Sequence, residues 1–194
     1  MTQSTGRSRR HLIMIAAVFI GPLLVASLIY SDNVGWQPIG RTNNGRLLTP
    51  IVNLDEAGDA DLLSGLTDGE TDKQWLLIYV DSAECRESCR EALYRMRQSR
   101  LMLGKTMNRL KRVFLHGASA PDTVFLDQQH RGLITINHNG IGDFLLKRRP
   151  QDLPVGGLYL VDPLGNLVMY FDAELDPRDM VSDIKHLLKL SRIG

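Results

Sequence analysis

The sequence predicts an α/β domain that follows one membrane-spanning helix. Two observations predict this organisation. Residues 12–30 are uncharged and almost wholly apolar, and they are long enough to cross a bilayer. Further along, an apolar stretch at 75–80 leads through a short polar break into an amphipathic segment, which is the pattern of a buried strand, a turn and a helix. A chain of 194 residues has room for one such domain and an appendage.

Residues 12–30 are the predicted transmembrane helix. At 1.5 Å per residue they extend about 28 Å, close to the hydrocarbon thickness of a bilayer. Arg7, Arg9 and Arg10 precede them without any acidic residue, so the positive-inside rule places residues 1–11 in the cytoplasm. A cleaved signal peptide is the alternative, although its apolar region is usually only about 7–15 residues long. In a bacterium we expect a single-pass inner-membrane protein whose C-terminal domain lies in the periplasm.

Composition argues against a nucleic-acid partner. The whole chain has a net charge of +1, and aromatic residues make up 6% of it. A nucleic-acid-binding domain is expected to present a strongly basic surface, whereas without the three N-terminal arginines the remainder has a net charge of about −2. The sequence also contains no phosphate-binding loop and no catalytic triad pattern.

Residues 31–70 are predicted to be a linker with an N-terminal hairpin, and residues 71–194 to be the domain itself. The first half of the linker is rich in Pro, Gly and Asn, which favour turns. Within it, 45–54 is predicted to be an edge strand interrupted by Pro50. The acidic, Gly-rich stretch that follows is interpreted as a surface loop or a short turn of helix.

Cys85 and Cys89 are the central feature of the predicted domain. They are the only cysteines, so within the molecule each can pair only with the other. They stand between the predicted strand and helix, where free N–H groups and the helix dipole favour a thiolate. Three interpretations follow: a structural disulfide, a redox-active dithiol, or a two-thiolate site for a soft ion such as Cu(I).

The spacing of the two cysteines constrains a disulfide. A loop this short gains only about 2 kcal/mol of chain-entropy stabilisation, so the bond would be a weak structural staple. Side chains four apart in a regular helix lie about 5–6 Å apart at Cβ, whereas a disulfide needs about 3.8 Å. The bond is therefore expected only if Cys85 lies in the turn before the helix, where it would be exposed and reducible.

The remaining elements alternate in type. A basic tract between 86 and 112 is interpreted as a solvated helix face. The functional alternatives are thiolate stabilisation by Arg86 and Arg90, or a docking surface for an acidic partner or anionic lipid. Asp176 and Pro177 are the predicted N-cap and first residue of a final helix. Short strands are expected at 113–116, 123–126, 133–136, 158–161 and 167–171, with a turn at 137–140. This order is that of a thioredoxin-like α/β domain.

The motifs resemble the Sco/SenC family of membrane-anchored copper proteins over residues 45–190. The resemblance lies in the anchor, the strand WLLIYV leading into C-x3-C, a strand after the helix, and the string GLYLVDPLGNLVMYF. It implies a thioredoxin fold and a role in assembling the copper centre of cytochrome c oxidase, with an oxidase subunit or another assembly factor as partner. Cys85 and Cys89 match the cysteine ligands of the family.

The chain departs from the family at the histidine ligand. Members carry that histidine five residues before the hairpin aromatic, and counting back from Tyr159 reaches Pro154. The chain is thus similar to a divergent member that lacks the copper-ligand histidine. A proline before this strand instead resembles the substrate-binding cis-proline of thioredoxins. His116 is the candidate replacement ligand, because its predicted strand ends at the sheet edge where the cysteines lie.

These observations predict thiol–disulfide exchange in oxidase assembly. Cys85 is expected to attack a partner disulfide and Cys89 to resolve the mixed disulfide, because the residue nearer the helix start is usually more exposed. One alternative is a Cu(I) metallochaperone that uses the same two cysteines with His116 or with a ligand from a partner. The other is a non-catalytic docking subunit.

Overall fold

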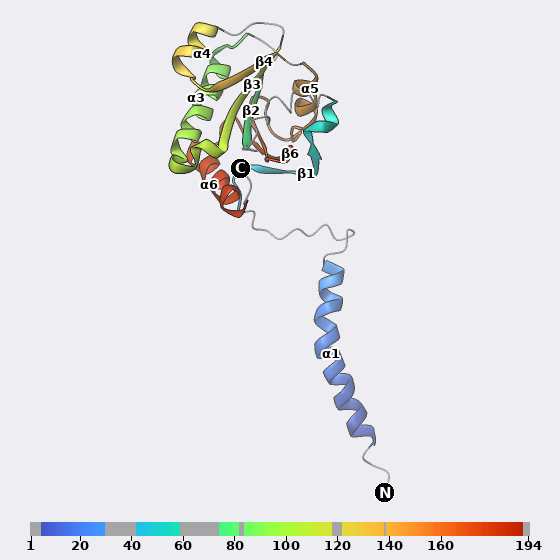
Figure 1. Ribbon diagram of the computed structural model, residues 1–194. Helices are drawn as coiled ribbons and strands as arrows, with labels where there is room; N and C mark the ends of the chain where they lie inside the picture. The colour runs from blue at the N-terminus through green and yellow to red at the C-terminus, as the bar shows by residue number, and fades with distance from the viewer. Residues whose placement is uncertain are drawn as a thin grey trace. The chain divides into compact units, whose positions relative to one another are not determined.

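The computed structural model describes residues 5–29, 42–58, 74–81, 84–117, 122–137 and 139–191. The chain divides into two compact units, residues 1–42 and 43–194. The described element of the first unit is the helix α1 (Thr5–Ile29), drawn in blue in Figure 1. Its segment Arg9–Leu28 has a mean hydropathy of 2.3 and none of it is buried. By length and composition this helix is able to cross a membrane, as the sequence predicts.

The second unit is built on one six-stranded sheet in the order β1-β6-β5-β2-β3-β4. Strands β2, β3 and β4 are parallel to one another, whereas β5, β6 and β1 each run antiparallel to their neighbour. The predicted α/β class is therefore confirmed. The strands are β1 (Arg46–Asn53), β2 (Trp75–Asp81), β3 (Leu110–His116), β4 (Leu133–Asn137), β5 (Leu158–Val161) and β6 (Asn166–Phe171).

Helices cover both faces of this sheet (Figure 1). One face carries α3 (Glu87–Met102), α4 (Thr123–Gln129) and α6 (Pro177–Leu190). The other carries α5 (Asn139–Arg148) and the short 3-10 helix η1 (Leu54–Ala57). A second 3-10 helix, η2 (Gly104–Arg109), joins α3 to β3.

The central strand β2 is apolar except for its last residue, Asp81, as expected for a strand that is covered on both sides. Its side chains alternate between the two faces, as the pleat requires. Leu77 and Tyr79 pack under α3 and α6, whereas Leu76 and Ile78 pack under α5. The strand ends where Asp81 leaves the core, and this end positions the cysteines.

Two predictions for the middle of the chain are wrong. Residues 123–126, predicted to be a strand, begin helix α4, and the predicted turn at 137–140 runs into the start of α5 at Asn139. Asp122 explains the first difference, because its side chain caps α4 by accepting a hydrogen bond from the Phe125 N–H at 3.0 Å. The β-favouring residues of this stretch obscure that capping signal in the sequence.

Strand β1 belongs to the same sheet as β2, the strand that leads to the cysteines. It pairs with β6 at the sheet edge and contains Pro50, as predicted for 45–54. Asp183 of α6 fixes its start by accepting hydrogen bonds from the backbone N–H groups of Asn44 (2.8 Å) and Gly45 (2.7 Å). Part of the stretch predicted as linker is thus a strand of the domain. The hairpin expected before it falls largely on residues 30–41, which lie outside the described residues.

Candidate functional site

The cysteine pair lies at the carboxyl end of β2, before and within the first turn of α3. Cys85 precedes the helix and Cys89 is its third residue, so the pair meets the geometric condition that the spacing imposes. The two sulfurs form a disulfide, with 5.0 Å between the Cα atoms. The structure therefore brings together the two residues predicted to carry the chemistry.

The two sulfur-bearing residues have unequal surroundings. Cys89 is fully buried among the core residues under α3. Cys85 is half-buried and lines an open surface pocket with Arg86, Arg90 and Tyr94, which we call the cysteine pocket. A partner approaching from solvent therefore meets Cys85 first. The bond was expected to be exposed, but Cys85 is only half-buried and Cys89 is buried.

The start of α3 favours negative charge on sulfur. Arg86 is the N-cap residue and makes no side-chain capping bond, so the first N–H groups of the helix have no cap acceptor. Cys89 lies in this first turn, where the helix dipole stabilises a thiolate. The guanidinium of Arg90 lies 4.7 Å from the Phe125 ring centroid, which holds this cation beside the cysteine pocket.

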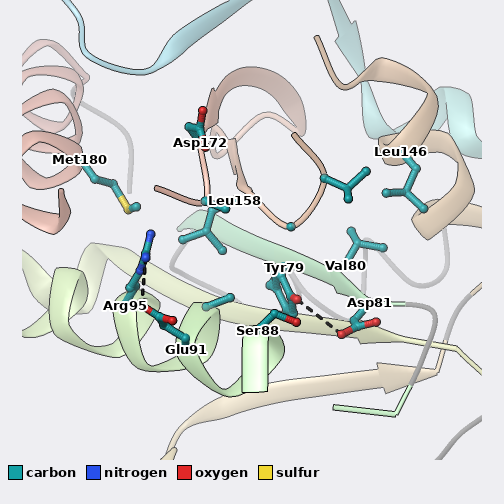
Figure 2. Close-up of a pocket in the computed structure, with 14 residues that line it drawn as sticks. Tyr79, Val80, Asp81, Ser88, Glu91, Arg95, Leu146, Leu158, Asp172 and Met180 are labelled. Atoms are coloured by element: carbon teal, nitrogen blue, oxygen red, sulfur yellow. Dashed lines mark hydrogen bonds and ion pairs between the residues drawn. The ribbon is translucent and has the colours of Figure 1, made fainter. Parts of the chain in front are cut away.

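A second pocket of about 470 Å³ opens on the other side of the first turns of α3. Figure 2 shows this main pocket, with Ser88 and Arg95 from α3 and Asp172 after β6 among its walls. Glu91 is shared by both pockets, so the main pocket and the cysteine pocket meet at one helix position. The main pocket thus adjoins the cysteine pocket and extends the surface available to a partner.

Charged groups in the main pocket are partly paired. Arg95 binds Glu91 through Nη2 at 2.9 Å, while its buried Nη1 has no hydrogen-bond partner. The Tyr79 hydroxyl donates to Asp81 at 3.4 Å. Burial, and then the charge of Asp81, raise the pKa of Tyr79 above its usual value, so Tyr79 stays a neutral donor. This pocket could not be predicted from the sequence, because its walls come from β2, α3, α5, β5, α6 and two loops that are far apart along the chain.

Pro154 lies in the loop before β5, which forms one wall of the main pocket through Val155 and Gly156. Pro154 is exposed, and among the described residues the cis peptide bond is at Pro50, not at Pro154. Its carbonyl accepts a hydrogen bond from the Tyr170 hydroxyl at 2.7 Å. The loop is therefore near the expected place, but the likeness of Pro154 to a thioredoxin cis-proline does not extend to the peptide bond.

His116 ends β3 directly opposite Asp81 of β2, because the two strands are parallel. It thus reaches the predicted edge of the sheet. Its Nδ1 lies 3.0 Å from the Gly117 carbonyl and donates to it. Within the described ranges, no three His, Cys, Asp or Glu side chains form a group that could hold a metal ion. The structure accordingly does not join His116 to the cysteines as a ligand set.

A family model described as "Transmembrane-like, thioredoxin-like, C-terminal domain" matches residues 75–191, and the thioredoxin-like fold is thereby confirmed. No curated protein sequence matches the chain.

Solved structures give similarities of fold. Copper-bound ScoI from Arabidopsis thaliana is 14% identical and has a TM-score of 0.50, covering 78% of this chain and 100% of its own. Copper-bound Sco1 from yeast is 19% identical (TM-score 0.49; 61% and 77% covered). The thioredoxin domain of a thiol-disulfide oxidoreductase from Bacteroides vulgatus is 13% identical (TM-score 0.42; 72% and 94% covered). At these identities the likeness concerns the fold alone.

Proposed function

Since the chain belongs to the family of transmembrane-like, thioredoxin-like C-terminal domains, we propose that it exchanges disulfides with a partner protein through Cys85 and Cys89. The observation that carries this proposal is the unequal burial of a disulfide placed at a helix start. Exchange requires one sulfur that a partner can reach and a second that is held ready to close the bond. Half-buried Cys85 is the sulfur that a partner can reach, and buried Cys89 is the sulfur that closes the bond.

The reaction passes two electrons. In the reduced protein, the Cys85 thiolate attacks one sulfur of a partner disulfide, and the other partner sulfur leaves as a thiolate with the bonding electron pair. The Cys89 thiolate then attacks Cys85 Sγ, which re-forms the intramolecular disulfide seen here and releases the second partner thiolate. The partner thiolates take their protons from solvent. The reverse sequence oxidises a partner dithiol.

We propose that the main pocket binds the polypeptide of the partner while the partner's disulfide reacts with Cys85. It adjoins the cysteine pocket at Glu91, and the unpaired Nη1 of Arg95 offers a donor for a backbone carbonyl. Pro154 would act here through its loop, whose residues Val155 and Gly156 line the pocket.

The proposed setting is the cell inner membrane, with α1 as a single-pass anchor and the domain in the periplasm. The apolar segment Arg9–Leu28 supports the anchor, and the N-terminal arginines support this orientation. From the Sco/SenC resemblance, we propose that the partner is a cytochrome c oxidase subunit or another factor in assembly of its copper centre.

A matched pair of variants tests the exchange. Reduced full-length protein carrying Cys89→Ser should accumulate a mixed disulfide with a disulfide-bonded peptide from an oxidase subunit, because the resolving sulfur is missing. Cys85→Ser should trap little peptide, because buried Cys89 is poorly reached. The adduct is counted by intact mass under denaturing, alkylating conditions. Equal trapping by both variants, or none by either, contradicts the assignment of Cys85.

Copper carriage is the second candidate, favoured by two sulfurs and His116 at one edge of the sheet. The residues do not fit a three-ligand site, since no such group occurs in the described part of the chain. Two thiolates alone suit Cu(I) as cargo. Anaerobic Cu(I) titration of the reduced protein tests copper carriage. Tight one-to-one binding that vanishes in the double Cys→Ser variant would support it.

The docking-subunit alternative has a separate test. Full oxidase assembly by the double Cys→Ser variant would indicate that the protein acts without its cysteines.

A further inference from the structure

Arg112 is a buried cation on the central part of the sheet. It lies on β3 and only 3% of its surface is exposed. One nitrogen, Nη2, donates to the carbonyl of Arg131 at 2.6 Å. Its Nε and Nη1 are buried without a hydrogen-bond partner. A guanidinium has five N–H donors and no acceptor, so most of the donor capacity of this side chain is unused.

The charges around Arg112 are of the same sign. Burial, followed by repulsion from Arg100 and Arg97 of α3, lowers the pKa of Arg112 to about 10. The group therefore remains protonated at neutral pH. Arg97 donates to the Gln129 carbonyl at 2.7 Å and Arg100 to the Leu110 carbonyl at 2.9 Å. Among the described residues, none of the three arginines pairs with a carboxylate.

Further unpaired polar atoms lie on the elements that cover Arg112. His130, which follows α4, is 3% exposed, and its Nδ1 has no partner. Arg112 and Arg97 both act on the charge of His130, so the three side chains are close enough to interact. Ser99 is fully buried on α3 and its hydroxyl is unpaired as well. Among the described residues, these four buried polar atoms on β3, on α3 and just after α4 thus have no hydrogen-bond partner.

We propose that a compact inorganic anion, of the phosphate or chloride class, binds between β3, α3 and the end of α4. A buried charge without a counter-charge is strongly destabilising, and an anion would offset the charge of Arg112 while accepting from its free Nε and Nη1. Water would accept hydrogen bonds but would leave the charge uncompensated. The site is too enclosed for a macromolecular ligand, because Arg112 and His130 are each 3% exposed.

An entrance for a small ion lies beside this cluster. A pocket of about 500 Å³ between α4 and β4 is lined by His130, Arg131, Thr123 and Thr135. Arg112 itself does not line this pocket, but it donates to the carbonyl of Arg131, which does. The acidic residue Asp127 also lines it, which favours an ion of small size and low charge over a polyanion.

Thermal unfolding of the full chain in neutral detergent tests the site. Phosphate and chloride are titrated separately, with ionic strength held constant by sodium gluconate, whose anion is too large to enter. The wild-type Tm should rise with the concentration of one of these ions, because the ligand binds only the folded state. Arg112→Met should weaken the apparent affinity by about tenfold or more, since hydrogen bonds to a charged group contribute that much.

A matched control excludes general salt effects. Arg178→Met makes the same chemical change at an exposed position on α6 and should leave the response unchanged. In gluconate alone, Arg112→Met should be as stable as the wild type or more stable, because it removes an uncompensated buried charge. If Arg112→Met does not fold, Ser99→Ala serves, with a severalfold loss expected. Two results would contradict the anion site: a wild-type Tm that neither phosphate nor chloride raises, or an equal rise in Tm for the wild type and Arg112→Met.

Discussion

At the residue scale, the two cysteines have different environments, because Cys85 is half-buried beside an open pocket and Cys89 is fully buried in the core. The spacing predicted that Cys85 must precede the helix, and it does. Nothing in the sequence predicted that Cys89 would be fully buried, since its burial depends on strands far along the chain that complete the core. The same limit applies to Arg112, which lies in a tract interpreted as a solvated face and is buried on β3.

His130 makes a pH-dependent contribution to stability. Burial first, and then the charges of Arg112 and Arg97, lower its pKa below the usual 6.5. The folded state therefore binds fewer protons than the unfolded state, so stability is full above about pH 6.5 and falls as the pH drops through the folded pKa. We expect urea unfolding in phosphate-free buffer to show a smaller loss on acidification for His130→Gln than for the wild type. Identical losses would contradict this role of His130.

At the scale of elements, patterns that are local in sequence were predicted correctly. Strands β2, β5 and β6 follow from apolar runs bounded by turn residues, and α6 begins at Asp176 and Pro177 as their capping chemistry indicates. Helix α4 was missed because its β-favouring residues outweighed a single cap. The walls of the main pocket could not be predicted, because they depend on strand order rather than on any one segment.

The loop before β5 depends on one hydroxyl from β6. Tyr170 donates to the Pro154 carbonyl at 2.7 Å and accepts from the Gly157 N–H at 3.0 Å, and its side chain is fully buried. Tyr170→Phe should lower the free energy of unfolding by about 1–3 kcal/mol, because it leaves a buried N–H unpaired. It should also slow peptide exchange by loosening this wall of the main pocket. Urea unfolding and exchange rates measure both effects, and wild-type values for both would contradict the role of Tyr170.

The start of β1 depends in the same way on α6. Asp183 is 5% exposed and accepts from the backbone N–H groups of Asn44 and Gly45. Asp183→Ala should reduce stability by about 1.5–3 kcal/mol, the usual contribution of hydrogen bonds to a charged group. Asp179→Ala, one turn earlier at an exposed position, is the control. Equal unfolding midpoints for the two variants would mean that the hydrogen bonds to Asp183 do not stabilise the start of β1.

At the scale of the whole molecule, a helix able to cross a membrane precedes a thioredoxin-like domain. The full chain should remain with membranes after an alkaline wash, because Arg9–Leu28 is apolar along a membrane-spanning length. Residues 43–194, which form a compact unit by themselves, should be recovered in the soluble fraction. Sedimentation of both forms provides the measurement. A full chain released by the wash would contradict the anchor.

The central claim is that Cys85–Cys89 is a working redox couple. Its most direct test is a redox titration of the full chain against glutathione and dithiothreitol buffers, with the reduced fraction read by thiol alkylation and mass. We predict a reversible two-electron transition within the range of known exchange proteins, about −270 to −120 mV. A pair that stays oxidised below about −300 mV would be a structural disulfide, and the proposed exchange would then be contradicted.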